Sequence, residues 1–537
     1  MNNHPNYNPY PSHRSVIYAK NGMVATSQPL AAQVGLDILK KGGNAIDAAI
    51  ATAACSSVVE PTSNGIGGDA FAMVWAKGTL HGLNASGPAP KSISIEKVKQ
   101  LGHKKMPTFG WLPITVPGAP AAWAKLSEEF GNLSLPDVLE PAIKYARMGY
   151  PISPALGYFW NLTYEFYKEK MDKNEFSEWY QTFAPKGRAP KVGEIFSSMA
   201  HGLTLEKIGK TNADSFYRGE LAEKIVAESK KSGGFLTYED LSDYKPEWVK
   251  PIKVNYRGYD VWELPPNGQG IVALSALNIL KNFSFTTRET VDTVHKQIEA
   301  LKLAFTAGKT AISDPKFVNT NTVESLLSND FAEKLAKKIG NKALGLNACE
   351  LAKGGTVYLC TADEKGNMVS YIQSNYMGFG SGIVIPNTGI AMQNRGADFS
   401  LDPEHANALI GGKKTYHTII PGFLTKDKQA IGPFGVMGGY MQPQGHVQVI
   451  MNTIDFALNP QMALDAPRFR WVKGKKVEIE KNFPTHIATE LAACGHDIKI
   501  MLESGSFGRG QIIWRDFKSG VLAGATESRC DGSVAAY

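Results

Sequence analysis

The sequence predicts a layered fold in which helices pack against β-sheets. Two observations lead to this prediction: segments with helical periodicity occur in both halves of the chain, and β-rich runs lie between them. A third observation is that the chain has no internal repeat and no low-complexity linker, so we expect one continuous folding unit. Hydrophobic residues make up 43% of the 537 residues and charged residues 20%, a composition that allows a large buried core.

The charge balance, the cysteines and the hydropathy exclude several classes of protein. Lys+Arg 57 against Asp+Glu 50 gives a formal charge of +7, which is too modest for a protein that coats nucleic acid. Residues 1–18 are polar, and no run approaches the roughly 18 apolar residues of a membrane span, so we expect a soluble, cytoplasmic protein. The five cysteines form no CxxC pair, which predicts reduced, mostly buried thiols at Cys55, Cys349, Cys360, Cys494 and Cys530.

The first predicted helix starts near Ser27 and Pro29 and ends at the glycine pair 42–43. A hydroxyl before the first turn satisfies free N–H groups, and proline presets the helical φ angle. We therefore expect Ser27 to cap this helix.

A second helix and a strand follow directly. Asn44 and Asp47 have the spacing of a capping box and open an alanine-rich segment, 45–58, which we expect to be a buried helix. The turn-prone residues 65–69 then lead into a short apolar run, 70–76, that predicts a buried strand.

The middle of the chain, residues 120–250, shows amphipathic helical patterns and little chemistry. A further helix is predicted over residues 291–310 from apolar side chains three and four positions apart. Two β-rich runs, 356–361 and 368–374, are separated by Asp363-Glu364-Lys365-Gly366-Asn367, which is typical of a hairpin turn.

The last third of the chain predicts mixed structure. Strands and turns are expected up to Leu424, a helical region over residues 442–458, and strands around residues 511–514.

Short motifs exclude several kinds of site. Residues 65–70 fit the loose dinucleotide pattern GxGxxG/A, but they follow a helix and open a strand, so we interpret them as a tight turn. The chain has no phosphate loop, no HExxH and no GxSxG. We therefore expect no metal and no cofactor. Gly354-Gly355-Thr356, taken alone, predicts only a flexible loop before a strand.

Four separated stretches change that interpretation, because together they resemble the γ-glutamyltransferase family of N-terminal-nucleophile hydrolases. The closest likeness is to its cytoplasmic glutathione hydrolase-like branch in bacilli, with oxamate amidohydrolases and cephalosporin acylase-like proteins as near relatives. The resemblance implies an α+β fold, a four-layer αββα sandwich. The stretches are residues 42–49, residues 65–68, Thr356 through Phe399, and Gly438-Gly439 followed by Ala466-Pro467-Arg468-Phe469.

The resemblance also implies that the chain cuts itself between Gly355 and Thr356. This gives a large fragment, residues 1–355, and a small fragment, residues 356–537, which stay together as one αββα heterodimer, with a dimer of heterodimers left open. A threonine hydroxyl is a poor nucleophile unless a base lies beside it, and a free α-amine titrates close to neutral pH. Cleavage therefore creates the base on the same residue as the nucleophile.

The family pattern, carried forward without a gap, assigns supporting roles to four residues. Ser374 would orient the nucleophile, and Asp398 would bind the substrate amine. Gly438 and Gly439 would supply backbone N–H groups to the developing oxyanion. The alternative for Asp398 is a turn residue that caps its own backbone, and the alternative for the glycines is a plain tight turn.

The sequence departs from the family at the substrate positions. The family's carboxylate-binding arginine is replaced by Asn84, and a position that is usually Gln or Glu is Arg395, which offers a guanidinium to a carboxylate unless it forms a structural salt bridge. The family's paired serines fall on His417 and Thr418, and its amine-contacting asparagine falls on Tyr376, with Asn375 one residue earlier.

These residues lead to one main functional hypothesis and two alternatives. The main one is a self-processing hydrolase or acyltransferase that cleaves γ-glutamyl amides such as glutathione through an acyl-enzyme on Thr356. The first alternative keeps the mechanism but takes a small acidic amide such as oxamate, or an acyl side chain of the cephalosporin acylase kind. The second is a homologue that only binds metabolites. None of the three involves nucleic acid or a membrane.

Overall fold

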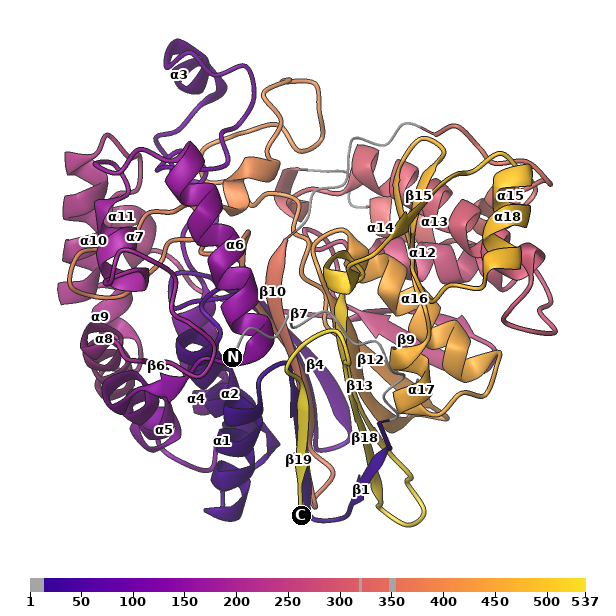
Figure 1. Cartoon of the computed structure of the whole chain (residues 1–537), viewed down its shortest axis with the longest axis horizontal. Coiled ribbons are helices and arrows are strands. Elements are labelled where there is room, and N and C mark those ends of the chain that lie inside the picture. Colours follow the sequence, from indigo (N-terminus) through magenta and orange to yellow (C-terminus); the bar gives the residue numbers. More distant parts are fainter. Residues whose placement is uncertain (1–13, 318–320, 347–353) are drawn as a thin grey trace.

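Two seven-stranded sheets stack against each other in the computed structural model, which describes residues 14–317, 321–346 and 354–537 (Figure 1). The pairs of strands within both sheets are antiparallel. The first sheet has the order β1 (Ile17–Ala19), β18 (Leu522–Thr526), β17 (Arg509–Arg515), β13 (Gln429–Met437), β12 (Gly422–Lys426), β9 (Tyr259–Glu263), β8 (Ile252–Tyr256). The second has the order β19 (Ser533–Ala536), β2 (Gly22–Thr26), β10 (Gly355–Asp363), β11 (Met368–Tyr376), β3 (Asp69–Ala76), β4 (Thr79–Ala85), β7 (Glu247–Val249).

A helical layer covers the outer face of each sheet, which confirms the predicted four-layer αββα sandwich (Figure 1). The layer on the second sheet is drawn at the left of Figure 1 and comes from the first half of the chain. Its helices are α1 (Pro29–Lys40), α2 (Ala45–Val59), α4 (Ala119–Phe130), α5 (Leu135–Met148), α6 (Pro154–Lys170), α7 (Ser177–Phe183), α8 (Met199–Lys210), α9 (Asp214–Tyr217), α10 (Glu220–Lys231) and α11 (Tyr238–Ser242).

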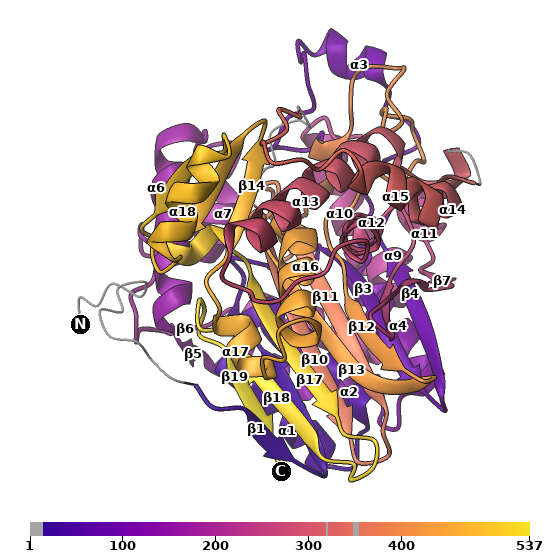
Figure 2. The ribbon, with the colours of Figure 1, turned by 90° about the vertical axis from the view of Figure 1, so that its right-hand side faces the viewer.

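The other helical layer covers the first sheet, and Figure 2 shows α12, α13 and α16 in front of its strands. Its helices are α12 (Gly270–Leu280), α13 (Val291–Ala311), α14 (Thr322–Leu327), α15 (Asn329–Ala336), α16 (Met441–Ile454), α17 (Pro460–Asp465) and α18 (Thr485–Ala493). Smaller elements are α3 (Ile95–Gln100), the pair β5 (Tyr150–Pro151) and β6 (Ile195–Phe196), and the sheet of β14 (Phe469–Lys473), β15 (Lys476–Glu480) and β16 (Asp497–Met501).

Side chains of β10 alternate between two cores, as the period of a strand requires. Tyr358 and Cys360 point into the apolar layer between the two sheets, whereas Leu359 packs against the helices that cover the second sheet. The strand that begins at the predicted cleavage site is therefore buried on both faces, which fixes its register.

The predicted helices and strands are confirmed almost throughout. Asn44 and Asp47 form the capping box of α2, and every residue of that helix is buried. The hairpin of β10 and β11, the strand β3 and the helix α13 also lie where the sequence places them.

Two predictions about local structure are wrong. The cap of α1 is the side chain of Gln28, which accepts from the N–H groups of Leu30 and Ala31, whereas the Ser27 hydroxyl donates to Glu60 Oε2 at 2.5 Å. Residues 377–421 contain the expected turns, but isolated bridges and one 3₁₀ turn, Arg395–Asp398, take the place of the expected strands. These loops bond to side chains and to other loops, which leaves no continuous ladder for a strand.

Four cysteines lie in the described part of the chain as free thiols, with Cys55, Cys360 and Cys530 buried and Cys494 partly exposed. Cys349 lies outside the described residues, as does most of the polar stretch 1–18. Among the described helices, none combines the length and the apolar character needed to cross a membrane.

Candidate active site

The predicted nucleophile, Thr356, lies at the start of β10 inside the second sheet, with 1% of its surface exposed. The register between β10 and β11 pairs Gly355 with Tyr376 and shifts before Val357. Thr356 falls at this irregularity, so the Gly355–Thr356 peptide bond enters the sheet where the regular ladder is interrupted.

A short chain of hydrogen bonds joins the Thr356 hydroxyl to the carbonyl before it. Thr356 Oγ1 lies 3.0 Å from Ser374 Oγ and 2.7 Å from the Gly355 carbonyl oxygen. Ser374 Oγ donates to the same carbonyl at 2.7 Å and accepts from the backbone N–H of Tyr376 at 2.8 Å. Ser374 therefore both holds the threonine hydroxyl and polarises the carbonyl that it would attack.

The glycine pair Gly438-Gly439 lies beside Gly354, two residues before the predicted nucleophile. A Cβ atom on Gly354 would lie 3.4 Å from Gly439 Cα and 2.8 Å from the Tyr376 carbonyl oxygen. Gly438 and Gly439 have φ angles of +136° and +58°, which glycine adopts without strain. The buried Gln269 donates to the Gly439 carbonyl at 3.0 Å and fixes this turn. The close approach fits the predicted oxyanion role, which stays a prediction.

Asp398 accepts hydrogen bonds from two tyrosines. The hydroxyls of Tyr376 and Tyr440 donate to its Oδ1 at 2.9 and 3.0 Å, and Arg395 Nη1 lies 3.4 Å from Oδ2. Tyr440 follows the glycine pair directly, so the same turn carries both groups. Asp398 therefore binds side chains of the site rather than capping its own backbone turn.

Arg395 is the first residue of the 3₁₀ turn and has 1% of its surface exposed. Its side chain faces the loop that precedes β12. Its guanidinium lies 4.0 Å from the centre of the Tyr376 ring, and Nη1 donates to Thr418 Oγ1 at 2.8 Å. Nη2 has no hydrogen-bond partner among the described residues. The predicted salt bridge is present, but only through one nitrogen at 3.4 Å from Asp398, so the guanidinium keeps an unused donor.

Sequence reasoning missed Lys309, Tyr416 and Tyr440, which complete this cluster. Lys309 lies on α13, bonds the Tyr440 hydroxyl, and places its ammonium 4.2 Å and 3.9 Å from the ring centres of Tyr416 and Tyr440. Nothing in the sequence marks Lys309, because a lysine in the last turn of a helix belongs to no recognisable motif. The position of Tyr440 after a glycine pair was the one usable signal.

His417 and Asn84 lie in a second buried polar cluster, and none of the hydrogen bonds within the described part of the chain joins them to Arg395 or Asp398. His417 Nε2 donates to Asp69 Oδ2 at 3.0 Å, and burial lowers the pKa of the imidazole well below its usual range, so the ring is neutral. Asn84 bonds to Ser86 and Asn267. Asn84 and His417 therefore bond neither Arg395 nor Asp398, although His417 lies within electrostatic reach of Arg395, and Thr418, the next residue, accepts a hydrogen bond from that arginine.

Asn375 also points elsewhere. Its amide packs against the turn at residues 65–68, where a Cβ on Gly65 would lie 2.9 Å from Nδ2. Tyr376, one residue later, is the residue of this pair that contacts Asp398.

One group of buried side chains has the composition of a metal site, although the sequence predicts none. Ligand atoms of His295, Glu299 and His496 lie within 4.8 Å of one another. Lys302 Nζ donates to Glu299 Oε1 at 2.7 Å and lies 3.5 Å from His496 Nδ1. His295 Nε2 donates to the Gly340 carbonyl, so its Nδ1 accepts from His496 Nε2. The Lys302 ammonium therefore supplies the positive charge that a metal ion would bring, and both imidazoles have partners on both nitrogens.

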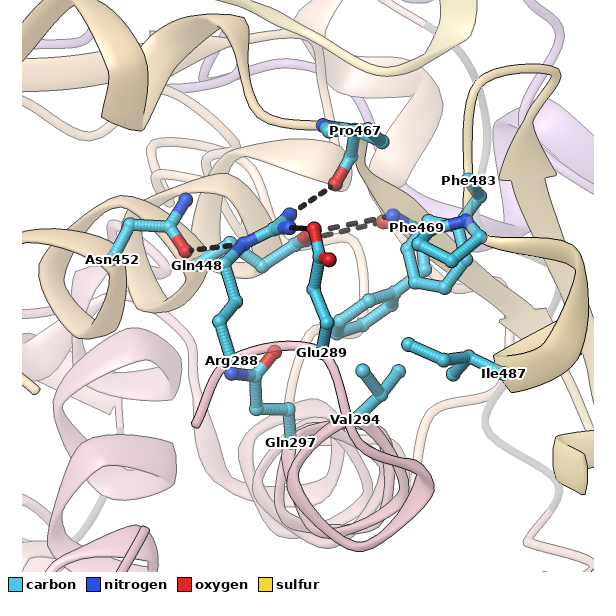
Figure 3. Close-up of a pocket in the computed structure, with 11 residues that line it drawn as sticks. Arg288, Glu289, Val294, Gln297, Gln448, Asn452, Pro467, Phe469, Phe483 and Ile487 are labelled. Carbon is cyan, nitrogen blue, oxygen red and sulfur yellow. Dashed lines mark hydrogen bonds and ion pairs between the residues drawn. The ribbon is translucent and has the colours of Figure 1, made fainter. Parts of the chain in front are cut away.

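The pocket drawn in Figure 3 lies between α13, α16 and the segment around Pro467, and it contains none of the predicted site residues. Its charged centre is Arg288, whose three guanidinium nitrogens bond to Asn452, Glu289 and the Pro467 carbonyl. Each of its three nitrogens therefore already has a partner, and its charge is paired with Glu289.

The chain is similar to known proteins over almost its whole length. The family model described as gamma-glutamyltranspeptidase matches residues 31–537. The glutathione hydrolase-like YwrD proenzyme of Bacillus subtilis is 35% identical over 97% of this chain and 99% of its own, and the oxamate amidohydrolase proenzyme of Klebsiella pneumoniae is 32% identical over 96% and 98%. The crystal structure of a cephalosporin acylase from Bacillus halodurans is 61% identical, covers 100% of this chain and 99% of its own, and superposes with a TM-score of 0.97.

We expect Ser374→Ala to slow self-cleavage about a hundredfold, because it removes one donor to the carbonyl oxygen on which charge develops. Ser374→Thr keeps a hydroxyl at the same position and serves as the matched control. The conversion of full-length chain into two fragments is followed on denaturing gels over time. Equal rates in the alanine and threonine variants would contradict this role for the hydroxyl.

Exhaustive dialysis against a chelator should leave amidase activity within about twofold, because Lys302 already neutralises Glu299 in the buried histidine group. No nucleotide should be required, because the sequence has no phosphate loop. Metal content is measured on the same samples. A loss of activity that a divalent ion restores would show that this group, or another, holds a metal.

Proposed function

Because the chain belongs to the gamma-glutamyltranspeptidase family, we propose that it is a self-processing N-terminal-threonine hydrolase or acyltransferase that opens γ-glutamyl amides such as glutathione. The observation that carries this proposal is the hydrogen-bond chain from the Thr356 hydroxyl through Ser374 to the Gly355 carbonyl. Two relatives named as proenzymes support the maturation step and a heterodimer of its two fragments.

Maturation begins when Thr356 Oγ1 adds to the Gly355 carbonyl carbon. The bond from this carbon to the Thr356 nitrogen then breaks, and the nitrogen takes up the hydroxyl proton to become a free amine. Water hydrolyses the resulting ester, which leaves a carboxylate on Gly355 and restores the hydroxyl. The products are fragments 1–355 and 356–537.

The same atoms then act on a substrate. The Thr356 amine takes the hydroxyl proton as Oγ1 attacks the amide carbon, and it returns the proton to the leaving amine. Backbone N–H groups of Gly438 and Gly439 stabilise the oxyanion, while water or an amino acid accepts the acyl group from Thr356.

A second substrate class has its own support. Asn84 replaces the arginine that would hold an α-carboxylate, and Arg395 presents a buried guanidinium nitrogen that has no hydrogen-bond partner in the described part of the chain. A relative is named for oxamate and a similar structure for cephalosporin acylase activity. The same acyl-enzyme chemistry would then open a small acidic amide or remove an acyl side chain.

The first test concerns maturation. Purified protein should resolve into two fragments, the smaller one beginning at Thr356, while Thr356→Ala should remain one uncut and inactive chain. N-terminal sequencing and a γ-glutamyl anilide assay check both points. A small fragment that starts at another residue, or an active alanine variant, would refute the assignment.

The second test concerns Arg395. Arg395→Ala should lower kcat/KM for a carboxylate-bearing substrate about ten to a hundredfold, because a charge-assisted hydrogen bond contributes about 1.5 to 3 kcal/mol. Arg395→Lys keeps the charge but loses the planar arrangement of donors, and its kcat/KM should fall between those of the unaltered enzyme and Arg395→Ala. If the alanine variant stays within twofold for every such substrate, Arg395 has a structural role only.

A further inference from the structure

A buried ion pair, separate from the cluster around Asp398, links two segments near the predicted cleavage site. Arg509 Nη1 donates to Glu60 Oε1 at 3.2 Å. Both side chains are buried, with 5% of Glu60 and 9% of Arg509 exposed. Glu60 belongs to the predicted large fragment and Arg509 to the small one, so the pair crosses the interface that the cut would create.

Glu60 leads into the turn that contacts Gly355. It is the C-cap of α2, and the Ser27 hydroxyl donates to its Oε2 at 2.5 Å. A Cβ atom on Gly355 would lie 3.0 Å from the Thr62 carbonyl oxygen and 3.3 Å from Ser63 Cα. The position of the Gly355 carbonyl therefore depends on where this turn lies.

Arg509 lies next to the glycine turn on the other partner of the pair. It is the first residue of β17 and pairs with Met437, the last residue of β13, after which Gly438 and Gly439 follow directly. A Cβ atom on Gly438 would lie 3.2 Å from the Cα of Gly508, the neighbour of Arg509. The backbone of Arg509 is therefore in direct register with the turn that we expect to bind the oxyanion.

Net stability is a poor explanation for this ion pair. Removing two charges from water costs about as much as their attraction returns, although the loss of one partner alone is costly. Burial raises the pKa of Glu60, and the Arg509 guanidinium acts against this shift, whereas Asp531 adds a repulsion. A charge-assisted hydrogen bond does hold its two partners at a defined distance. The pair therefore supplies geometry more than stability.

Resting on the acyl-enzyme function proposed above, we propose that Glu60 and Arg509 form a positioning pair. The pair holds the Gly438 turn at a fixed distance from the Gly355 carbonyl, in self-cleavage and then in the acyl-transfer reaction. In the described part of the chain neither side chain bonds Thr356, so both act through the turns that follow or precede them. The pair should therefore set rates and leave the binding of substrate almost unchanged.

Removal of one charge and removal of both charges distinguish positioning from stability. Arg509→Met leaves a buried carboxylate alone, so Tm should fall, and kcat for γ-glutamyl anilide should fall about tenfold with KM within about twofold. The double variant Glu60→Gln/Arg509→Met removes both charges and should recover most of the Tm, while kcat and the rate of self-cleavage stay about tenfold low. The double variant also carries the test if Arg509→Met does not fold. Rates that recover together with Tm would show a structural role only and overturn the proposal.

Two further variants serve as controls. Arg509→Lys keeps a charged donor for Glu60 and should stay within about threefold of the unaltered enzyme. Arg515→Met makes the same change at the far end of β17 and should leave both rates within about twofold.

The two proposals fail in different ways. Unchanged rates in folded Arg509→Met would overturn the positioning pair and leave the proposed function intact. An unaltered chain that matures but cleaves neither γ-glutamyl anilide nor oxamate would overturn the proposed function, whereas the rate of self-cleavage in the variants would still test the pair.

Discussion

Tyr376 ends β11 in a left-handed backbone conformation, with a φ of +74°, which a bulky side chain adopts only where its surroundings impose it. From this position its N–H donates to Ser374, beside the nucleophile, and its hydroxyl donates to Asp398. Its ring supports the Arg395 guanidinium. Tyr376 therefore sets the distance between the Thr356 hydroxyl and the group formed by Asp398 and Arg395. The rest of the site depends on this strained turn.

The residues behind the site show how a buried charge is tolerated. Burial raises the pKa of Asp69 to about 7, whereas the Arg395 guanidinium and backbone N–H groups act in the opposite direction. Its oxygens face N–H donors of Gly118, Gln393 and His417, which favour the ionised form. Arg395 thus has a second carboxyl group within electrostatic reach, which helps to stabilise its buried guanidinium.

The sequence predicted best what depends on neighbouring residues. Helix α2, with its Asn44 cap, and the hairpin of β10 and β11 follow from periodicity and turn chemistry, and the resemblance supplied the four layers and Thr356. Lys309 could not be predicted, because only tertiary packing brings it to Tyr440, which lies 131 residues further along the chain. Asn84 was assigned by position, but the structure gives its amide other partners. Loop residues 377–421 likewise bond to distant segments, which local patterns do not record.

The order of strands in the two sheets has a consequence for how the chain folds and how its fragments stay together. In the second sheet β2 lies between β19 and β10, and in the first sheet β1 and β9 flank strands that follow Thr356, so both parts of the chain alternate within each sheet. Such interleaving forms readily when one continuous chain folds, because all strands are at high effective concentration. After one peptide bond is cut, two separate chains would have to meet and thread into each other's sheets. If the chain is cut as proposed, we therefore expect a slow rate of unfolding to preserve the two-fragment form, and we expect separated fragments not to reassemble readily.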